Sequence, residues 1–550
     1  MRERRDKTSF ASCYKDIMVT TVAVIGAGAS GLTAIKCCLD EGLEPTCFEG
    51  SDDIGGLWRY TEEVDAGRPS IYRSVVTNGC KEMMCFSDFP IPDHFPNYLS
   101  HFKVMEYYRL YAEHFNLLQY IRFKTRVCSV RRCPDFSTTG QWLIVTEANG
   151  RQESAVFDAV LVCTGHFTKP YLPLELFPGI GTFKGQYFHS REYKTPRTEF
   201  HGKRILVVGL GNSAADIATE LSYVADQVFL STRRGVLVIS RIFGFGYPWD
   251  AIYISRIKSW LRDLLPASIE MWMVHRAVNK WFDHAAYGLE IQKSLEWKEP
   301  IANEELPSRI ACGTVVIKAG VKEFTETSAI FEDGTIEENI DGVIFATGYS
   351  LSFPFLDESV LKVENNRIFL YKNMFPPCLE KPTLAAIGLV QPVGSLAPIS
   401  ELQARWATRV FKGLNQLPSM GEQLEEINKV TELLIKRFGR NRACSLLVNN
   451  IAYLDEIASE IGAKPSIPRL FLADPKLALH VLFGPCLPSQ YRLTGPGKWD
   501  GARRTILTTW DRIFKPTRTR VVNNAPQHSI SMLLGFLCFA ILFAGVLIIN

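Results

Sequence analysis

Two glycine-rich segments carry the residues whose types and spacing are best suited to chemistry. The first follows an apolar stretch at 22–25 and reads Gly26-Ala27-Gly28-Ala29-Ser30-Gly31. Glycines at this spacing permit a tight turn, let a pyrophosphate approach the backbone and let the next helix pack closely on the strand. A further apolar stretch at 45–48 ends in Glu49, where an acid can bond the hydroxyls of a ribose. The segment therefore predicts a dinucleotide site whose phosphates face the start of a helix.

The same pattern recurs later in the chain. The stretch 204–208 leads into Gly209-Leu210-Gly211-Asn212-Ser213-Ala214-Ala215, with alanine as an accepted variant at the third glycine position. The next apolar stretch, 227–231, ends in Thr232-Arg233-Arg234 instead of an acid. Arginine at this place suits a ribose 2′-phosphate, which favours NADPH over NADH. The alternative is that the arginines only solvate the end of a strand, and we expect this of one of them.

A third repeat indicates which elements position these loops. Residues 157–165 and 340–348 each read as a buried strand that ends in Thr-Gly, and each follows its glycine-rich loop at the same distance in the chain. Two similarly built modules are the simplest account. We predict an α/β fold with two Rossmann-like dinucleotide-binding domains, which hold FAD beside Glu49 and NADPH beside Arg233.

Composition excludes several classes of protein. A chain of 550 residues exceeds a single ordinary core, so two or more domains are expected. The 61 basic and 58 acidic residues give a net charge of only +3, which disfavours nucleic acid as a partner. The 14 cysteines show neither a CxxC pair nor a regular spacing. We therefore expect reduced thiols, no disulfide scaffold and no metal site.

The two ends of the chain differ in kind. Residues 1–17 are polar, of mixed charge, and lack the apolar run of a secretory signal. Residues 530–549 are apolar at nearly every position, and a helix of this length reaches about 30 Å, the thickness of a hydrocarbon core. We predict a transmembrane tail anchor at 529–549. Basic residues just upstream place the rest of the chain on the cytosolic side: Arg512, Lys515, Arg518 and Arg520.

A second membrane contact is conceivable at 258–273. This segment is rich in Trp, Leu and Met, interleaved with Lys258 and Arg262. Such a composition suits a helix that lies in the membrane interface. The alternative, which we favour from the sequence, is ordinary packing within the protein.

Further motifs resemble a known family when taken together. Around the two glycine-rich loops stand Phe183-x-Gly185-x-x-x-His189-x-x-x-Tyr193, the stretch GLGNSAADIA from Gly209, and FATGY at 345–349. The chain resembles the flavin-containing monooxygenases. Stretches at 77–85, 305–309 and 483–486 are similar to its vertebrate, N-oxide-forming branch. The likeness spans about residues 18–522 plus the terminal anchor. It departs from the family at the 17-residue leader and at Gly50, where arginine is expected after the acid.

The resemblance implies an FAD domain interrupted by an inserted NADPH domain. Residues 18–171 form the first part of the FAD domain, and 172–339 form the NADPH domain with a helical insertion at about 240–300. Residues 340–525 return to complete the FAD domain and add a helical region. Residues 1–17 are an extension ahead of this fold.

The resemblance also implies the chemistry. Reduced flavin and O2 form a C4a-hydroperoxide that oxygenates the nitrogen or sulfur of lipophilic amines and sulfides, including xenobiotics.

Asn78 matches the family's active-site asparagine and is our candidate catalytic residue, although its residue type alone favours a turn before Gly79. Thr77 is expected on the nicotinamide side. Leu57 and Trp58 are expected against the flavin, with core packing as the alternative for Trp58. The helix start at 212–215 is expected to present its amides to the NADPH pyrophosphate.

Three further residues are interpreted from this resemblance. His189 is taken as part of a linker that couples domain motion to cofactor binding, and not as a catalytic base. Tyr193 favours oxidation of heteroatoms, because relatives that insert oxygen into ketones tend to carry Trp there. Tyr349 is expected to pack near the cleft.

Other functions remain open. Baeyer–Villiger oxygenation of ketones and NADPH oxidase activity that releases H2O2 are the enzymatic alternatives, and a degenerate membrane flavoprotein is the alternative without activity. Pyridine-nucleotide disulfide reductases share the architecture, but they need a spaced redox pair, and Cys37 and Cys38 are adjacent. By resemblance we expect the endoplasmic reticulum membrane as the location and a homo-oligomer as a possible assembly.

Overall fold

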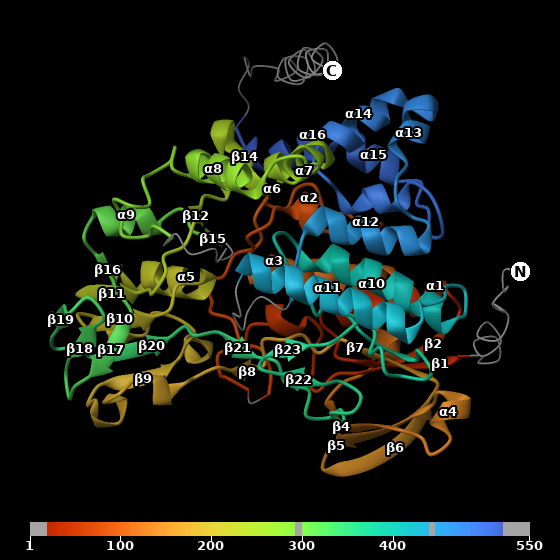
Figure 1. Ribbon diagram of the computed structural model, residues 1–550, viewed down its shortest axis with the longest axis horizontal. Coiled ribbons are helices and arrows are strands. Elements are labelled where there is room, and N and C mark those ends of the chain that lie inside the picture. The colour runs from red at the N-terminus through yellow and green to blue at the C-terminus, as the bar shows by residue number, and fades with distance from the viewer. Residues whose placement is uncertain (1–18, 66, 292–299, 439–445, 521–550) are drawn as a thin grey trace, which may run out of the picture.

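The computed structural model describes residues 19–520, apart from 66, 292–299 and 439–445. Two parallel five-stranded sheets form its framework, the first on the right of Figure 1 and the second on the left. The strand order of the first sheet is β24–β7–β1–β2–β3. These strands are β1 (Thr21–Ile25), β2 (Glu44–Phe48), β3 (Ile121–Arg122), β7 (Ala159–Val162) and β24 (Leu384–Ala386). Strands β1 and β7 are almost wholly buried, as their continuous apolar runs require.

The second sheet repeats this arrangement with the order β16–β11–β10–β20–β9. Its strands are β9 (Gln186–His189), β10 (Arg204–Val208), β11 (Gln227–Ser231), β16 (Val315–Lys318) and β20 (Gly342–Phe345). Strand β20 pairs with β10 as β7 pairs with β1, and both β7 and β20 are fully buried. This confirms the interpretation of 157–165 and 340–348 as equivalent buried strands.

The position of β20 also corrects the expected division of the chain. From the sequence, the chain was predicted to re-enter the FAD domain at residue 340. Strand β20 instead lies between β10 and β9, inside the second sheet. The boundary at 339/340 is therefore wrong, because a strand hydrogen-bonded on both sides within one sheet cannot begin the return to the other.

The chain crosses between the two sheets through a short ribbon. Strands β8 (Lys169–Pro170) and β21 (Tyr349–Ser350) are antiparallel neighbours, with Tyr349 opposite Pro170. Beside this pair, the backbone N–H of Tyr171 donates to the carbonyl of Gly348 at 2.8 Å. The outward and the return connection of the second sheet therefore lie side by side.

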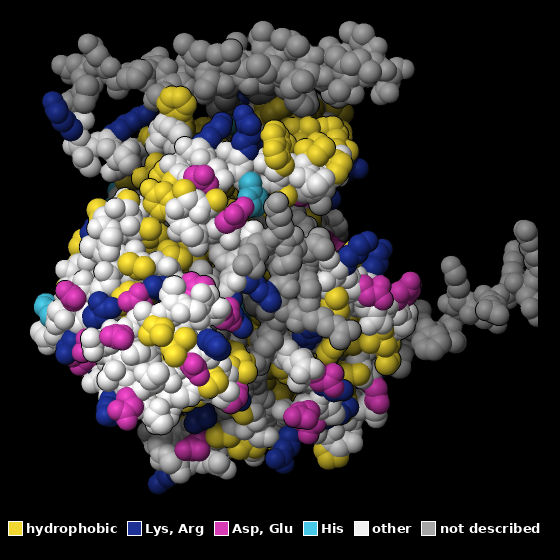
Figure 2. Space-filling view, turned by 60° about the vertical axis from the view of Figure 1, so that its left-hand side comes forward, with side chains coloured by type: hydrophobic (Ala, Val, Ile, Leu, Met, Phe, Trp, Pro, Cys, Tyr) yellow, Lys and Arg dark blue, Asp and Glu magenta, His cyan; other side chains and the backbone are white. Residues whose placement is uncertain are grey.

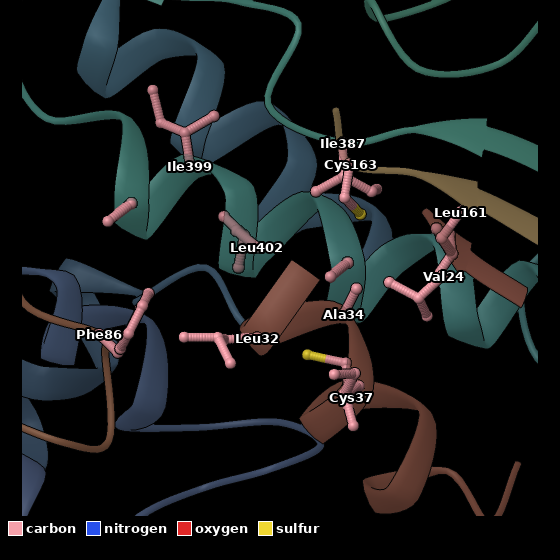
Figure 3. Packing of buried hydrophobic residues seen from close by; sticks show 14 of the residues in the cluster. Val24, Leu32, Ala34, Cys37, Phe86, Leu161, Cys163, Ile387, Ile399 and Leu402 are labelled. Atoms are coloured by element: carbon pink, nitrogen blue, oxygen red, sulfur yellow. The ribbon is translucent and has the colours of Figure 1, made fainter. Parts of the chain in front are cut away.

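The first sheet is covered on both faces. On one face, Val24 and Leu161 pack with Leu32 of helix α1 (Ala29–Asp40) and Leu402 of helix α10 (Leu396–Phe411) (Figure 3). On the other face, the intervening side chains of the same strands pack against Trp142 of an antiparallel sheet. The covering helices are α1 (Ala29–Asp40), α3 (His101–His114), α10 (Leu396–Phe411), α11 (Met420–Phe438) and α12 (Asn450–Ile461). The antiparallel sheet is β4 (Thr125–Arg132), β5 (Trp142–Ala148) and β6 (Arg151–Phe157).

A group of short elements lies above both sheets in Figure 1. It comprises β13 (Ile242–Phe243), β14 (Tyr247–Pro248), α6 (Trp249–Tyr253), α7 (Arg256–Asp263), α8 (Ala267–Val278), α13 (Ile467–Ala473), α14 (Pro475–Phe483), α15 (Ala502–Leu507) and α16 (Thr509–Phe514). Many of its apolar side chains face solvent. Trp260 is 49% exposed, Leu264 63% and Trp272 60%. Figure 2 shows hydrophobic side chains gathered on the upper part of one face. Ordinary packing, favoured from the sequence for 258–273, is therefore wrong for these three residues.

The described ranges contain no helix that combines the length and apolarity needed to cross a bilayer. The anchor predicted at 529–549 and the extension at 1–17 lie outside the described residues.

A buried ionic cluster ties the C-terminal part of the chain to the first sheet's helices. The Arg492 guanidinium, 2% exposed, contacts Glu401 of α10 at 2.6 Å and Asp88 at 2.9 Å. Asp88 in turn contacts the Nζ of Lys36 in α1 at 2.6 Å. Because these charges lie away from water, each depends on its partners for stabilisation.

Replacing Arg492 with Met should strongly destabilise the protein. The substitution keeps most of the volume but leaves Glu401 buried with an uncompensated charge, which costs about 3–5 kcal/mol. We expect a clear fall of the apparent Tm in differential scanning fluorimetry. The exposed Lys103–Glu106 pair offers the matched control, since Lys103→Met should change stability by less than about 1 kcal/mol. Equal apparent Tm values for the two variants would contradict the importance of the cluster.

Candidate dinucleotide and oxygenation site

The first glycine-rich loop has the predicted strand–turn–helix form. It leaves β1 at Gly26, whose φ of +98° favours glycine, and enters α1 at Ala29. A Cβ on Gly31 would lie 1.8 Å from the carbonyl oxygen of Gly26, so only glycine lets α1 approach the turn so closely. No side chain caps the start of α1, and its first turn carries no acid. Its amides are therefore suited to an anionic phosphate.

Glu49 lies where the prediction placed it, at the end of β2 beside this loop. Its Oε2 accepts a hydrogen bond from the backbone N–H of Ala27 at 2.8 Å, and its Oε1 accepts from the N–H of Ser51 at 2.8 Å. The carboxylate is thus held at the edge of the predicted nucleotide site. This placement fits a ribose-binding acid.

Residues 55–58 also contribute to a cradle for a cofactor beside this loop. The N–H of Gly55 donates to the carbonyl of Ala27 at 3.0 Å, and a Cβ on Gly28 would lie 3.5 Å from the Cα of Gly56. Leu57 and Trp58 follow in a short 3-10 turn and are half-buried. Trp58 packs against the core of the first sheet, so the packing alternative holds for part of its surface. Contact of either side chain with flavin remains a prediction.

The second loop repeats the geometry of the first. Gly209 has a φ of +109°, and a Cβ there would lie 2.5 Å from the carbonyl oxygen of Ala346, much as Gly26 lies against Cys163. Helix α5 (Asn212–Leu221) follows Gly211 and has no side-chain cap. The side chains of Ala214 and Ala215 are buried, so these two residues can offer only backbone amides to a phosphate.

The side chain of Asn212 is already engaged within the protein. Its Oδ1 accepts a hydrogen bond from the N–H of Ala302 at 3.0 Å. Arg233 is exposed just beyond β11, and its stem lies over Gly320, where a Cβ would come 2.6 Å from Arg233 Cγ. An exposed guanidinium at the end of this strand fits a 2′-phosphate.

Asn78 lies on a turn that the inserted region holds from several sides. Its side-chain Oδ1 accepts a hydrogen bond from Nη2 of Arg241 at 2.9 Å. Arg241 also donates from Nε to the carbonyl of Thr77 at 3.2 Å and from Nη1 to Glu304 at 2.9 Å. Since Oδ1 is occupied, the Nδ2 amide is the part of Asn78 that can donate a hydrogen bond to a bound group. Within the described residues, Nδ2 makes no hydrogen bond of its own.

The Thr77 side chain, which was predicted to lie on the nicotinamide side, forms hydrogen bonds within the protein. Its hydroxyl donates to the carbonyl of Gly79 at 3.0 Å and accepts from the N–H of Leu99 at 2.9 Å. The side chain is buried. It therefore shapes the turn that carries Asn78, and its contact with nicotinamide stays a prediction.

Sequence reasoning missed Arg241. It lies outside every motif, in a segment whose only signal is one arginine among apolar residues at 236–243. The structure shows a side chain that is 10% exposed, with all three nitrogens bonded. Arginine is almost never buried unless it is paired, but the burial of Arg241 is visible only in the structure, so the sequence alone did not mark this position.

His189 makes two hydrogen bonds to the backbone. Nε2 lies 2.9 Å from the carbonyl of Gly348, and Nδ1 accepts from the N–H of Arg191 at 3.1 Å. Burial lowers the pKa of His189 to about 4, so the ring is neutral at physiological pH. Both nitrogens are occupied, which agrees with the interpretation that His189 is not a base. Tyr349 packs edge-on against this ring with centroids 5.3 Å apart.

Two parallel sheets, each with a glycine-rich loop between its central strand and the following helix, are the architecture of an α/β protein with two dinucleotide sites. The family model for flavin-binding monooxygenase-like proteins matches residues 19–550. The chain therefore belongs to this family. It is 58% identical over 520 residues to dimethylaniline monooxygenase [N-oxide-forming] 2 of Macaca mulatta, covering 94% of this chain and 97% of that protein. It is 57% identical to flavin-containing monooxygenase 2 of Homo sapiens, with the same coverage.

Solved structures with a similar fold are more distant in sequence. S-allyl-L-cysteine S-oxygenase from Allium sativum has a TM-score of 0.63 at 23% identity and covers 90% of this chain and 100% of its own. Cyclohexanone monooxygenase from Rhodococcus sp. Phi1, bound to NADP+, has a TM-score of 0.55 at 15% identity, with 81% and 98% covered. These likenesses show that the fold is shared.

Proposed function

We propose that this chain is an NADPH- and O2-dependent monooxygenase that holds FAD and oxygenates the nitrogen or sulfur of lipophilic amines and sulfides. The observation that carries the proposal is the pair of glycine-rich loops, together with an Asn78 side chain that Arg241 holds in place, in a chain that belongs to the flavin-binding monooxygenase-like family. Bound FAD supplies the oxygen-activating chemistry. Overall, NADPH gives two electrons, one oxygen atom joins the lone pair of the substrate, and the other leaves as water.

The chain's own residues bind the two cofactors and orient them for the reaction. The amides at the start of α1 hold the FAD pyrophosphate, and Glu49 holds its ribose. The amides at the start of α5 hold the NADPH pyrophosphate, with Arg233 on the 2′-phosphate. Asn78 donates a hydrogen bond from Nδ2, which adds no charge to the site and leaves the neutral substrate free to react. A base is not required, because the attacking lone pair belongs to the substrate itself.

Product analysis tests the proposal. Purified protein with FAD, NADPH and O2 is given a tertiary amine, a sulfide and a ketone in separate reactions. We expect an N-oxide and an S-oxide, with each product matched by NADPH consumed. A lactone or ester as the main product would establish ketone oxygenation. Release of H2O2 equal to NADPH consumed would establish an oxidase, and colourless protein that ignores NADPH would establish a degenerate flavoprotein. Any of these three results would overturn the proposal.

Arg233 should decide the preference between the two nicotinamide cofactors. Arg233→Gln removes a charge-assisted hydrogen bond worth about 1.5–3 kcal/mol, so we expect KM for NADPH to rise roughly 10- to 100-fold. KM for NADH, which lacks the phosphate, should not change. Arg234→Gln is the matched control at the neighbouring exposed position. If KM for NADPH is the same in Arg233→Gln as in the wild type, Arg233 only solvates the end of the strand.

We infer, in addition, that residues 529–549 anchor the protein in the endoplasmic reticulum membrane, with the two sheets on the cytosolic side. The support is the run at 530–549, which is apolar at nearly every position, and the basic residues ahead of it. The exposed Trp260, Leu264 and Trp272 support a second contact, since tryptophan and leucine at a surface suit the membrane interface.

Deleting 526–550 separates the two contacts. We expect the truncated protein to leave the membrane pellet and appear in the supernatant after centrifugation of cell extracts in physiological salt. If the truncated protein remains in the pellet, the anchor is not the sole attachment. Trp272→Ala in the truncated background should then release it, provided that α7 and α8 form the second contact.

A further inference from the structure

A small hairpin from the inserted region holds the turn that carries Asn78. Strands β13 and β14 pair with Phe243 opposite Tyr247, so the residues at the base of the hairpin, Arg241 and Trp249, meet. The backbone N–H of Trp249 donates to the carbonyl of Arg241 at 3.0 Å. Helix α6 begins at Trp249, directly at this base. Residues that are distant from Asn78 in sequence are thus brought to it from one compact element.

Trp249 and Asp250 form hydrogen bonds with the backbone of the turn, at residues 78 and 80. Nε1 of Trp249 donates to the carbonyl of Asn78 at 2.9 Å. The carboxylate Oδ2 of Asp250 accepts from the N–H of Cys80 at 2.7 Å. Their bonds fix the peptide groups of residues 78 and 80, and the guanidinium of Arg241 fixes the carbonyl of Thr77.

Burial makes these bonds effective. Asp250 is 1% exposed, and its Oδ1 also accepts from the N–H of Ala251 at 3.0 Å, so both oxygens are occupied. Burial raises the pKa of Asp250 to about 6. A Cβ on Gly79 would lie 3.2 Å from Oδ2, which shows how closely the turn rests on the carboxylate. A buried polar contact of this kind is costly to leave unmade.

We propose that Trp249 and Asp250 are positioning residues for oxygenation: they hold the 77–80 turn so that Nδ2 of Asn78 points at the reacting centre. This inference rests on the proposed function, in which Asn78 donates the essential hydrogen bond. A turn held only at its Asn78 side chain can swing about the backbone, whereas bonds to the carbonyl of residue 78 and the amide of residue 80 remove that freedom.

The variant that tests this is Trp249→Phe, which keeps an aromatic ring and removes the bond to Asn78. We expect product formed per NADPH consumed to fall about 2- to 10-fold, as loss of one hydrogen bond predicts, with the difference released as H2O2. Bound FAD, the rate of flavin reduction by NADPH and the apparent Tm should stay at wild-type values. Trp260→Phe, at an exposed tryptophan of α7, is the matched control and should keep wild-type coupling.

Hydrogen exchange of the holoenzyme gives a readout that does not depend on turnover. Peptides covering 77–84 should exchange faster in Trp249→Phe and in Asp250→Asn, which retains only one acceptor oxygen. They should not exchange faster in Trp260→Phe. In an Asn78→Ser background, Trp249→Phe should cause no further loss of coupling, because the group that it positions is absent.

Separate outcomes overturn the inference and the function beneath it. If the wild type forms oxides and Trp249→Phe keeps both wild-type coupling and wild-type exchange at 77–84, the positioning role is wrong and the function stands. An equal loss of coupling from Trp249→Phe with and without Asn78 also overturns the positioning role. If the wild type forms no oxide from an amine or a sulfide, the proposed function is wrong, and the positioning role with it.

Discussion

Asn78→Ser should leave the protein yellow with bound FAD while N-oxide formation falls by about 10²- to 10³-fold, the usual effect of removing one donor aimed at developing charge. The serine hydroxyl lies one bond closer to the backbone and cannot reach the place that Nδ2 occupies. It also leaves the Nη2 of Arg241 without its partner on Asn78. The cofactor cradle, formed by residues 26–31, 49 and 55–58, is untouched, so FAD should be retained.

The measurements are the flavin spectrum of the purified variant, NADPH consumption and N-oxide yield from a tertiary amine. NADPH consumption should continue and appear as H2O2. Asn97→Ser is the matched control: Asn97 is also half-buried, its side chain donates to the carbonyl of Ile513 at 2.9 Å, and its bond beside the turn, from the N–H of Lys81, is accepted by the backbone carbonyl that serine retains. It should keep oxygenation. Undiminished N-oxide formation by Asn78→Ser would remove Asn78 from the mechanism.

Gly31→Ala should abolish FAD binding. The new Cβ would lie 1.8 Å from the carbonyl oxygen of Gly26, and the positions of both atoms are fixed by the backbone, so no rotamer change can move them apart. Helix α1 must then separate from β1, which removes the start of the helix from the phosphates and opens the core around Leu32. We expect little soluble protein and no visible flavin absorbance in what remains.

Gly28→Ala is the companion variant that separates folding from binding. A Cβ at Gly28 would meet Gly56 at 3.5 Å, an ordinary contact, so the fold should persist. FAD affinity should still fall, because this glycine faces the site where the pyrophosphate approaches the backbone. Circular dichroism reports the fold, and the ratio of flavin to protein absorbance reports binding. Soluble, yellow Gly31→Ala protein would contradict the close approach of helix and turn.

The local architecture was predictable because each step has a short-range cause. Apolar runs at 22–25 and 204–208, glycines at the turns and the helix after each specify a strand, a loop and a helix without reference to the rest of the chain. The equivalence of 157–165 and 340–348 followed from repetition. The domain boundary predicted at residue 340 was wrong. Strand β20 pairs with β10 in the second sheet just as β7 pairs with β1 in the first. The repeat in the sequence could have indicated this pairing.

The site was less predictable because its contacts are long-range. Asn78 was found through resemblance to a family, and its own residue type favoured a simple turn. Arg241, Trp249 and Asp250 reach that turn from more than one hundred and sixty positions away in the chain. No pattern of hydrophobicity or spacing reports such a pairing. The exposure of Trp260 and Trp272 likewise depends on which surfaces other helices leave uncovered.

The paired connections β8 and β21 give the second sheet a particular mechanical character. A unit whose two ends meet at one narrow stem behaves as a cassette: it starts and finishes at the same point of its host, as inserted domains commonly do. The stem itself allows the cassette to pivot without stretching either link, but any such movement must break or carry with it the bonds that Arg241, Trp249 and Asp250 make to the 77–80 turn. The cassette could also be exchanged between relatives by cutting at the stem, where only two short strands would need to be rejoined.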